Sequence, residues 1–132
     1  MLKSTCIKAV VGKEDGLRIS IMSRHTKNDG RTLDPDISLK SYDEWWRALA
    51  PNEKTLGLYL RGESSFDSLS ECYRWKLFHD DAAYAAMLRL IELARSRNVT
   101  VLCVEDSPEY CHRKMLLEVC KRLEPELEVV IG

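Results

Sequence analysis

The feature that most restricts the fold of this chain is a run of six residues at positions 99–104, Val-Thr-Val-Leu-Cys-Val. The run is almost continuously apolar and rich in β-branched residues, which is typical of a strand covered on both faces. A helical pattern precedes it, and a second helix, over about 109–123, leads to an apolar segment at 127–131. Strands joined through a helix in this way run parallel, with a right-handed crossover. The sequence therefore predicts an α/β fold with a small, mainly parallel sheet flanked by helices.

Two further strands are expected near the N-terminus, over residues 2–11 and 17–24. In the second, Leu17, Ile19 and Ile21 alternate with more polar residues, as in a strand with two different faces. Residues 25–40 show no periodicity and form a long loop. Loops of this length are uncommon in small domains and are often functional.

Four helices are expected between this loop and the buried strand. Ser41 and Glu44 form a capping-box pattern that opens a short helix through Leu49. A second helix follows Pro51 over about 52–61 and ends at Gly62. The other two begin at serine or aspartate caps and carry apolar stripes at three- and four-residue spacing. Their expected caps are Ser65 for the third and Asp80 or Asp81 for the fourth.

The length of 132 residues favours one domain over residues 1–132. The net charge is only −1, which argues against a strongly basic nucleic-acid binder but leaves a local basic patch open. The first residues lack the apolar stretch of a signal peptide and no segment is apolar enough for a membrane span, so we expect a cytoplasmic protein. Its five cysteines lack CxxC spacing and should be reduced. They are Cys6, Cys72, Cys103, Cys111 and Cys120.

Chemically reactive residues gather after the buried strand, at Glu105, Cys111, His112 and Arg113. Ligands of parallel sheets bind beyond the carboxyl ends of the strands, and the first turn of a helix favours an anion. Arg113 in that turn can hold a phosphate or carboxylate through two hydrogen bonds. The same environment should lower the pKa of the Cys111 thiol. These residues predict an anion site with a candidate nucleophile.

Two arginines of the 17–24 strand complete the predicted ligand-binding set. Arg24 ends this strand, and in a parallel sheet it opens onto the same edge as Cys111 and Arg113. Arg18 lies on the same face but six residues back, roughly 20 Å away, which favours a structural or rim position.

The segment Cys103-Val104-Glu105, followed by Cys111-His112-Arg113, resembles the C-x-E…C-H-R signature of domain-of-unknown-function family 488 (DUF488), which includes the YeaO-like proteins. Further similar segments bring the resemblance to about residues 17–131. They are Arg18-Ile19-Ser20-Ile21, Asp43-Glu44-Trp45, Leu49-Ala50-Pro51, the series Phe66, Tyr73 and Leu77, and Val99-Thr100-Val101-Leu102. The family's Trp-Pro-Arg-Gly run is replaced here by residues 24–30. The resemblance implies an α/β fold and a site around the C-H-R segment, but no particular activity.

The sequence limits which chemistry Cys111 could carry out. A phosphatase mechanism is excluded, because a phosphatase loop needs an Arg six positions after its Cys, and Glu109 and Leu117 occupy those positions after Cys103 and Cys111. His112 is a poor base for Cys111 if both lie on a helix, where neighbours point about 100° apart. Zinc could be bound by Cys103, Cys111 and His112, with His79 as a further ligand, but the spacing matches no ordinary zinc motif, so neither a metal nor another cofactor is predicted.

Other residues also have a structural interpretation beside a functional one. Glu105 could act as a general base, but an ion pair with Arg113 or Arg24 is favoured. Cys72, Cys103 and Cys120 are interpreted as core residues. The tryptophans at 45 and 46, near basic residues of the long loop, could stack on a nucleotide or single-stranded nucleic acid, or one of them could anchor the core.

Two main hypotheses follow from these residues. The first, which we favour, is a module that binds an anionic small molecule such as a nucleotide through Arg24 and Arg113. The second is a thiol-dependent enzyme with Cys111 as the nucleophile and Glu105 or His112 handling protons. A protein- or nucleic-acid-interaction module is a third alternative. The sequence does not specify whether the chain is an enzyme or how it assembles.

Overall fold

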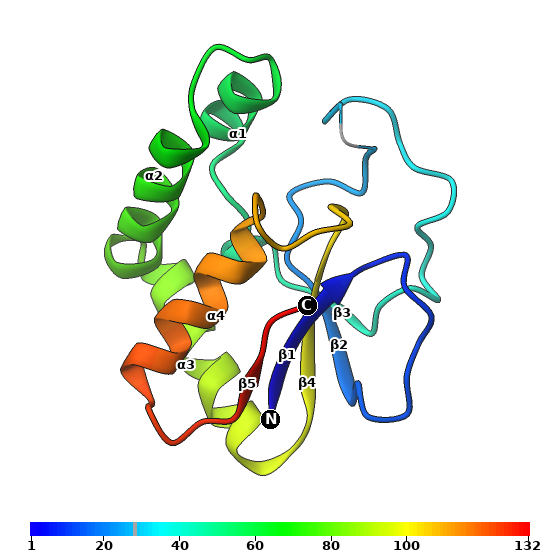
Figure 1. Cartoon of the computed structure of the whole chain (residues 1–132), viewed down its shortest axis with the longest axis vertical. Helices are drawn as coiled ribbons and strands as arrows, with labels where there is room; N and C mark the ends of the chain where they lie inside the picture. The colour runs from blue at the N-terminus through cyan, green and yellow to red at the C-terminus, as the bar shows by residue number, and fades with distance from the viewer. Residues whose placement is uncertain (28) are drawn as a thin grey trace.

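The computed structural model describes residues 1–27 and 29–132. Its described strands form one five-stranded sheet of order β3-β2-β4-β1-β5, in which every pairing is parallel (Figure 1). The strands are β1 (Leu2–Cys6), β2 (Leu17–Ser20), β3 (Glu44–Trp45), β4 (Val99–Cys103) and β5 (Val129–Val130). Strand β4 is central and buried at every position, as its apolar sequence predicts. The α/β fold and the parallel sheet are confirmed.

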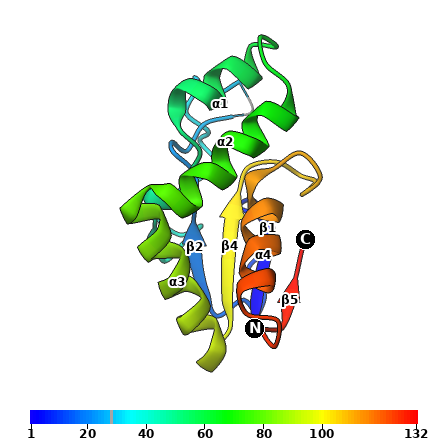
Figure 2. The ribbon, with the colours of Figure 1, turned by 90° about the vertical axis from the view of Figure 1, so that its left-hand side faces the viewer.

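The helices are α1 (Glu53–Leu60), α2 (Phe66–His79), α3 (Asp81–Ser96) and α4 (His112–Leu123), with a short 3-10 helix, η1 (Arg47–Leu49). The side chains of Asn52, Ser65 and Asp80 cap α1, α2 and α3, each accepting a hydrogen bond from a backbone amide of the first turn. Helices α3 and α4 lie over one face of the sheet, and α2 crosses toward its upper end (Figure 2). None of the helices in the described part of the chain is both long and apolar enough to cross a membrane.

The main core lies between this face of the sheet and the helices. Ile19 and Ile21 point into it together with residues of α3 and α4, which confirms the alternation read from the sequence. The opposite face carries Arg18, Ser20 and Thr100, and loops cover these polar residues so that they are buried as well. Both faces of β2 and β4, at the centre of the sheet, are therefore enclosed.

Several expected elements differ from the structure. The helix predicted over 41–49 is wrong: residues Glu44–Trp45 form the edge strand β3, and only η1 is helical. The edge of β2 accounts for this, because its carbonyls at Arg18 and Ser20 accept hydrogen bonds from the amides of Asp43 and Trp46. The N-terminal strand ends at Cys6 and β2 at Ser20, so both are shorter than expected. Helix α4 begins at His112 rather than near 109.

Candidate functional site

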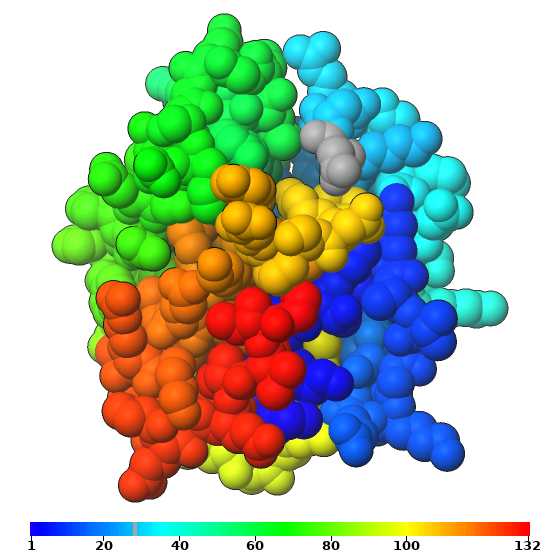
Figure 3. Space-filling model, viewed as in Figure 1, coloured from blue at the N-terminus to red at the C-terminus, as the bar shows by residue number. Residues whose placement is uncertain are grey.

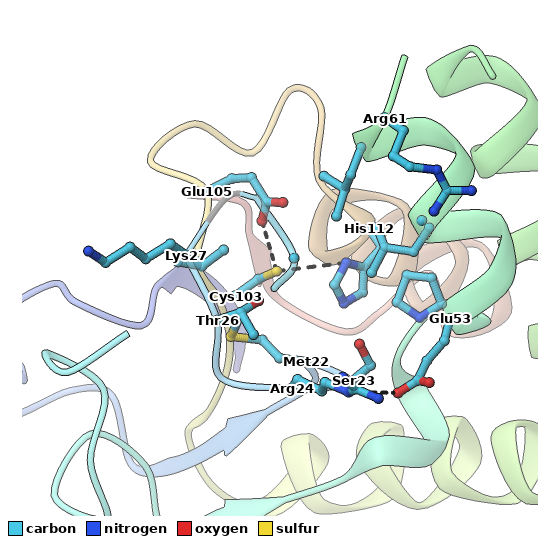
Figure 4. A pocket seen from close by; sticks show the side chains of 16 residues that line it. Met22, Ser23, Arg24, Thr26, Lys27, Glu53, Arg61, Cys103, Glu105 and His112 are labelled. Atoms are coloured by element: carbon cyan, nitrogen blue, oxygen red, sulfur yellow. Dashed lines mark hydrogen bonds and ion pairs between the residues drawn. The ribbon is translucent and has the colours of Figure 1, made fainter. Parts of the chain in front are cut away.

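A pocket of about 230 Å³ lies beyond the carboxyl ends of β2 and β4. Its walls come from the segment after β2, from helix α1, from the end of β4 and from the first residue of α4 (Figure 4). In Figure 3 the surface is hollowed between the green segment that carries α1 and the blue-to-cyan segment that follows β2. This is the edge of the sheet where the sequence predicts a site.

Two thiols, an imidazole and a carboxyl group converge on the floor of this pocket. The Cys103 and Cys111 sulfur atoms lie 2.9 and 3.2 Å from Oε2 of Glu105. The same sulfur atoms lie 3.7 and 3.9 Å from Nδ1 of His112. Cys103, Glu105 and His112 line the pocket directly (Figure 4), whereas Cys111 is not a lining residue and is only 2% exposed. The structure therefore brings all three predicted catalytic residues together and adds Cys103 to them.

The orientation of the His112 ring is fixed from its far side. Its Nε2 atom lies 2.8 Å from the carbonyl oxygen of Ile21. A carbonyl can only accept a hydrogen bond, so Nε2 carries the proton and Nδ1 presents its lone pair to the two thiols when the ring is neutral. The imidazole is thus positioned to accept a thiol proton or to bind a metal ion through Nδ1.

The local chain path explains how consecutive residues face one point. Cys111 is the N-cap of α4 and has extended backbone angles (φ −134°, ψ 142°), so it lies outside the helix that begins at His112. The 100° separation of helical neighbours does not apply to this pair, and the expectation that His112 is poorly placed beside Cys111 is wrong. Cys103 is the last residue of β4, and Glu105 follows two positions later, as on one side of an extended chain.

The four groups alter one another's pKa values. Burial would raise the pKa of the Cys111 thiol, but hydrogen bonding with Cys103 and the charges of His112 and Arg113 outweigh it, so that pKa lies well below its usual value. Burial and the neighbouring Cys111 raise the pKa of Cys103. The pKa of Glu105 is raised by burial and by Cys111. Burial opposes the charged form of His112, but Cys111 and Glu105 prevail and raise its pKa.

Arg113 contacts the protein's own backbone rather than the pocket. Its side chain is completely buried, and its Nε, Nη1 and Nη2 atoms donate hydrogen bonds to the carbonyl oxygens of Gly132, Glu105 and Asp106. The guanidinium thus holds the loop that follows β4. Glu105 uses its carbonyl for this contact, and in the described part of the chain no ion pair involves its carboxylate. The predicted pairing of Glu105 with Arg113 or Arg24 is therefore wrong.

Arg18 lies at the opposite end of β2 from the pocket. Its guanidinium is buried, with Nη1 2.6 Å from Oδ2 of Asp15 and Nε donating to the carbonyl of Ser41. This is the structural position that its distance from Arg24 predicts. Arg24 itself lines the pocket, where it forms an exposed ion pair of 3.3 Å with Glu53 of α1 (Figure 4).

Several wall residues could not be found from the sequence. Glu53 and Arg61 come from the two ends of α1, and Thr26 and Lys27 come from the segment after β2. Arg61 is exposed and paired with Glu63, and the Lys27 ammonium points away from the thiol cluster in Figure 4. Among the residues that the sequence analysis did not assign to the site, Cys103 could have been found, because it is two residues from Glu105 and residues two apart at a strand end share one side.

The tryptophans that the sequence suggests for stacking on a ligand make contacts within the protein instead. The Trp45 ring lies 4.0 Å from that of His25, and its Nε1 donates to the carbonyl of Met22. Trp46 packs against the main core. His79, the further zinc ligand considered, is stacked on Trp75 at the end of α2 and is not part of the cluster.

The fold and the pocket define a parallel α/β domain with a buried thiol, imidazole and carboxyl cluster at the carboxyl edge of its sheet. The chain belongs to the DUF488-N3a family, described as the active DUF488-N3 subclade, whose sequence model matches residues 2–123. The resemblance to DUF488 is thereby confirmed. No curated protein and no solved structure matches the chain.

Proposed function

We propose that the pocket binds a small molecule carrying an acidic group, such as a phosphate ester or a carboxylate. The observation that carries this proposal is the side-chain set of the pocket, in which the guanidinium groups of Arg24 and Arg61 lie around an opening whose floor is a buried thiol and imidazole cluster. A concave site with a few convergent polar groups is the usual form of a small-molecule site.

The acidic group would bind at the mouth rather than at the start of α4. Arg113 is fully engaged with backbone carbonyls, which leaves Arg24 and Arg61 as the arginines of the pocket wall. The Arg24 and Glu53 side chains of the ion pair are 63% and 61% exposed, so water screens their attraction. An incoming phosphate or carboxylate can replace Glu53 as the partner of Arg24 and gain a bidentate contact.

Ligand-induced stabilisation tests this proposal. Thermal unfolding of the reduced protein would be followed with inorganic phosphate, AMP and succinate at constant ionic strength, because a ligand that binds only the folded state raises the melting temperature. Arg24→Gln should remove most of the rise, and Arg89→Gln, an exposed arginine of α3, is the matched control. No rise with any of these anions, or an equal rise in both variants, would contradict the proposal.

A second candidate function, a thiol-dependent enzyme, is favoured by the contact of both thiols with His112 Nδ1. An imidazole fixed beside a thiol is the usual arrangement for activating a cysteine nucleophile. Mass spectrometry of protein briefly exposed to iodoacetamide would compare the cysteines. Labelling of Cys103 or Cys111 ahead of the exposed Cys72 would support this candidate, and labelling of Cys72 first would contradict it.

A further inference from the structure

We propose that the floor of the pocket binds a divalent ion of the zinc class, with Cys103 Sγ, Cys111 Sγ and His112 Nδ1 as protein ligands and the Glu105 carboxylate as the fourth donor. The sulfur and nitrogen atoms of the first three residues all lie within 4.8 Å of one another. This inference goes beyond anion binding at the mouth of the pocket, since it concerns different atoms and does not require that any anion binds.

The distances from His112 Nδ1 to the two sulfur atoms fit a tetrahedral zinc site. Ordinary Zn–S and Zn–N bond lengths place sulfur and nitrogen about 3.6 Å apart at the corners of a tetrahedron. The two observed separations from His112 Nδ1 are 3.7 and 3.9 Å. The Glu105 oxygen lies 2.9 and 3.2 Å from the sulfur atoms, but it is not within 4.8 Å of all three of the other donor atoms, so the carboxylate must move toward His112 to complete the tetrahedron.

The ligands are already held in orientation before an ion arrives. A histidine that binds zinc usually donates its other ring N–H to a carbonyl or carboxylate, and His112 makes this contact with the carbonyl of Ile21. Cys103 is held by the sheet, and Cys111 by its place at the start of α4. A preformed donor set loses little conformational freedom when it binds the ion.

The chemistry of the donors selects the type of metal. Two thiolates and an imidazole suit zinc and related borderline ions, whereas calcium and magnesium prefer sites made of oxygen. The cysteine side chains are 3% and 2% exposed, and His112 is 6% exposed. Because Cys103 and His112 also line the pocket, an ion can enter from the solvent without unfolding of the domain.

Binding of the metal ion releases protons from the ligands. Each of the two Zn–S bonds forms from a thiolate and the Zn–N bond from an unprotonated Nδ1, so any proton held by a thiol, by Nδ1 of His112 or by the Glu105 carboxyl leaves to the buffer. The ion's two positive charges then balance the two thiolates, and the Glu105 carboxylate adds one negative charge to the site. No oxidant or reductant takes part.

Cobalt binding tests the proposal. The full chain, reduced with a phosphine and freed of metal with a chelator, would be titrated anaerobically with Co²⁺. We expect one equivalent to bind, with the sulfur-to-cobalt charge-transfer absorption of thiolate ligands and the intense visible bands of tetrahedral Co²⁺. One equivalent of Zn²⁺ should then abolish both signals, because zinc binds such sites more tightly.

Variants assign the ligands. Cys103→Ser and Cys111→Ser should each weaken Co²⁺ binding at least about tenfold and reduce the charge-transfer absorption. Cys72→Ser, an exposed cysteine on α2, is the matched control and should leave the spectrum unchanged. If a ligand variant fails to fold, the wild-type spectrum alone decides, because the site requires thiolate absorption at one equivalent.

Two results would overturn the metal site: a wild-type titration without charge-transfer absorption, or a spectrum that persists when Cys103 and Cys111 are both replaced. The phosphate melting experiment would be repeated on chelator-treated and zinc-loaded protein. A phosphate effect without metal binding rejects only the metal site, and metal binding without an anion effect rejects only the anion proposal.

Discussion

The imidazole Nε2 of His112 lies 2.8 Å from the carbonyl oxygen of Ile21, so the first residue of α4 is tied to the residue that follows β2. Ile21 is itself bonded to β4, since its amide donates to the carbonyl of Leu102. The contact therefore joins the ends of two neighbouring strands to a helix beside the pocket. It also leaves Nδ1 as the atom that faces Cys103 and Cys111.

Replacing His112 should separate its structural role from its chemical one. His112→Ala leaves the buried carbonyl of Ile21 without its side-chain partner and opens a cavity, at a cost of about 2–4 kcal/mol in the free energy of unfolding. His112→Gln can return an N–H to that carbonyl and should cost less than His112→Ala. Urea denaturation of both variants checks this order, and equal losses would show that the hydrogen bond to Ile21 contributes little.

Much of the fold was predictable because its signals are local. The cap residues Asn52, Ser65 and Asp80 mark helix starts, and the apolar run at 99–104 identifies the central strand. The edge strand β3 was not predictable, since the hydrogen bonds that make Glu44–Trp45 a strand come from β2, more than twenty residues earlier. Local capping chemistry at Ser41 gave the opposite answer.

Prediction of the site is limited in the same way, because it depends on contacts that the fold makes and the local sequence does not show. Cys111 and His112 are adjacent in sequence, but whether both side chains face one point depends on where α4 begins, and a shift of a few residues changes the answer. Cys103 fits the pattern of a core strand and is buried, yet its sulfur contacts Glu105. The role of Arg113 depends on carbonyl groups brought near it by the fold, including that of Gly132.

The buried pair of Asp15 and Arg18 should make stability depend on pH. Burial alone would raise the pKa of the Asp15 carboxyl, but hydrogen bonds from the Gly12 amide and from Arg18 and Lys3 bring it below its ordinary value. A lowered pKa in the folded state contributes stability above the unfolded pKa of about 3.9, and this contribution disappears as the pH falls through the folded value. Wild type should therefore exceed Asp15→Asn in stability at pH 6, with the gap shrinking below about pH 4.

Urea unfolding midpoints between pH 6 and pH 3 measure this gap. Other carboxyl groups titrate in both proteins, so their effects largely cancel when the two midpoints are subtracted. Glu14→Gln, at the exposed neighbouring position, serves as the control and should give a small difference at every pH. A gap between wild type and Asp15→Asn that stays constant down to pH 3 would contradict the assigned role of Asp15.

Two glycines with positive φ should respond differently to alanine. Gly16 has φ +63°, and a Cβ there would lie 2.0 Å from the carbonyl oxygen of Asn98, while Gly62 has φ +75° with nothing within 4 Å. Gly62→Ala should lower the free energy of unfolding by only about 1–2 kcal/mol, the cost of a positive φ for a residue with a Cβ. Gly16→Ala must also displace the backbone before β4 and should lose clearly more. Chemical denaturation of the two variants measures the difference, and similar losses would show that the chain at Asn98 yields easily.

Arg113 should prove to be a structural residue rather than a ligand-binding one. Its guanidinium spans three backbone carbonyls, at Gly132, Glu105 and Asp106, and is completely buried. Arg113→Met leaves these carbonyls without their charged donor, at an expected cost of about 3–5 kcal/mol in the free energy of unfolding. Arg113→Lys should also destabilise the protein, because an ammonium cannot reproduce the planar set of N–H groups.

Arg24→Gln supplies the contrast, since Arg24 is exposed at the pocket mouth and pairs only with Glu53 among the described residues. Its replacement should change stability by less than about 1 kcal/mol while reducing the stabilisation by phosphate. Urea denaturation and phosphate melting curves on both variants separate the two roles. If Arg113→Lys folds with wild-type stability and loses only the phosphate effect, then Arg113 binds the ligand and the division of roles between the two arginines is wrong.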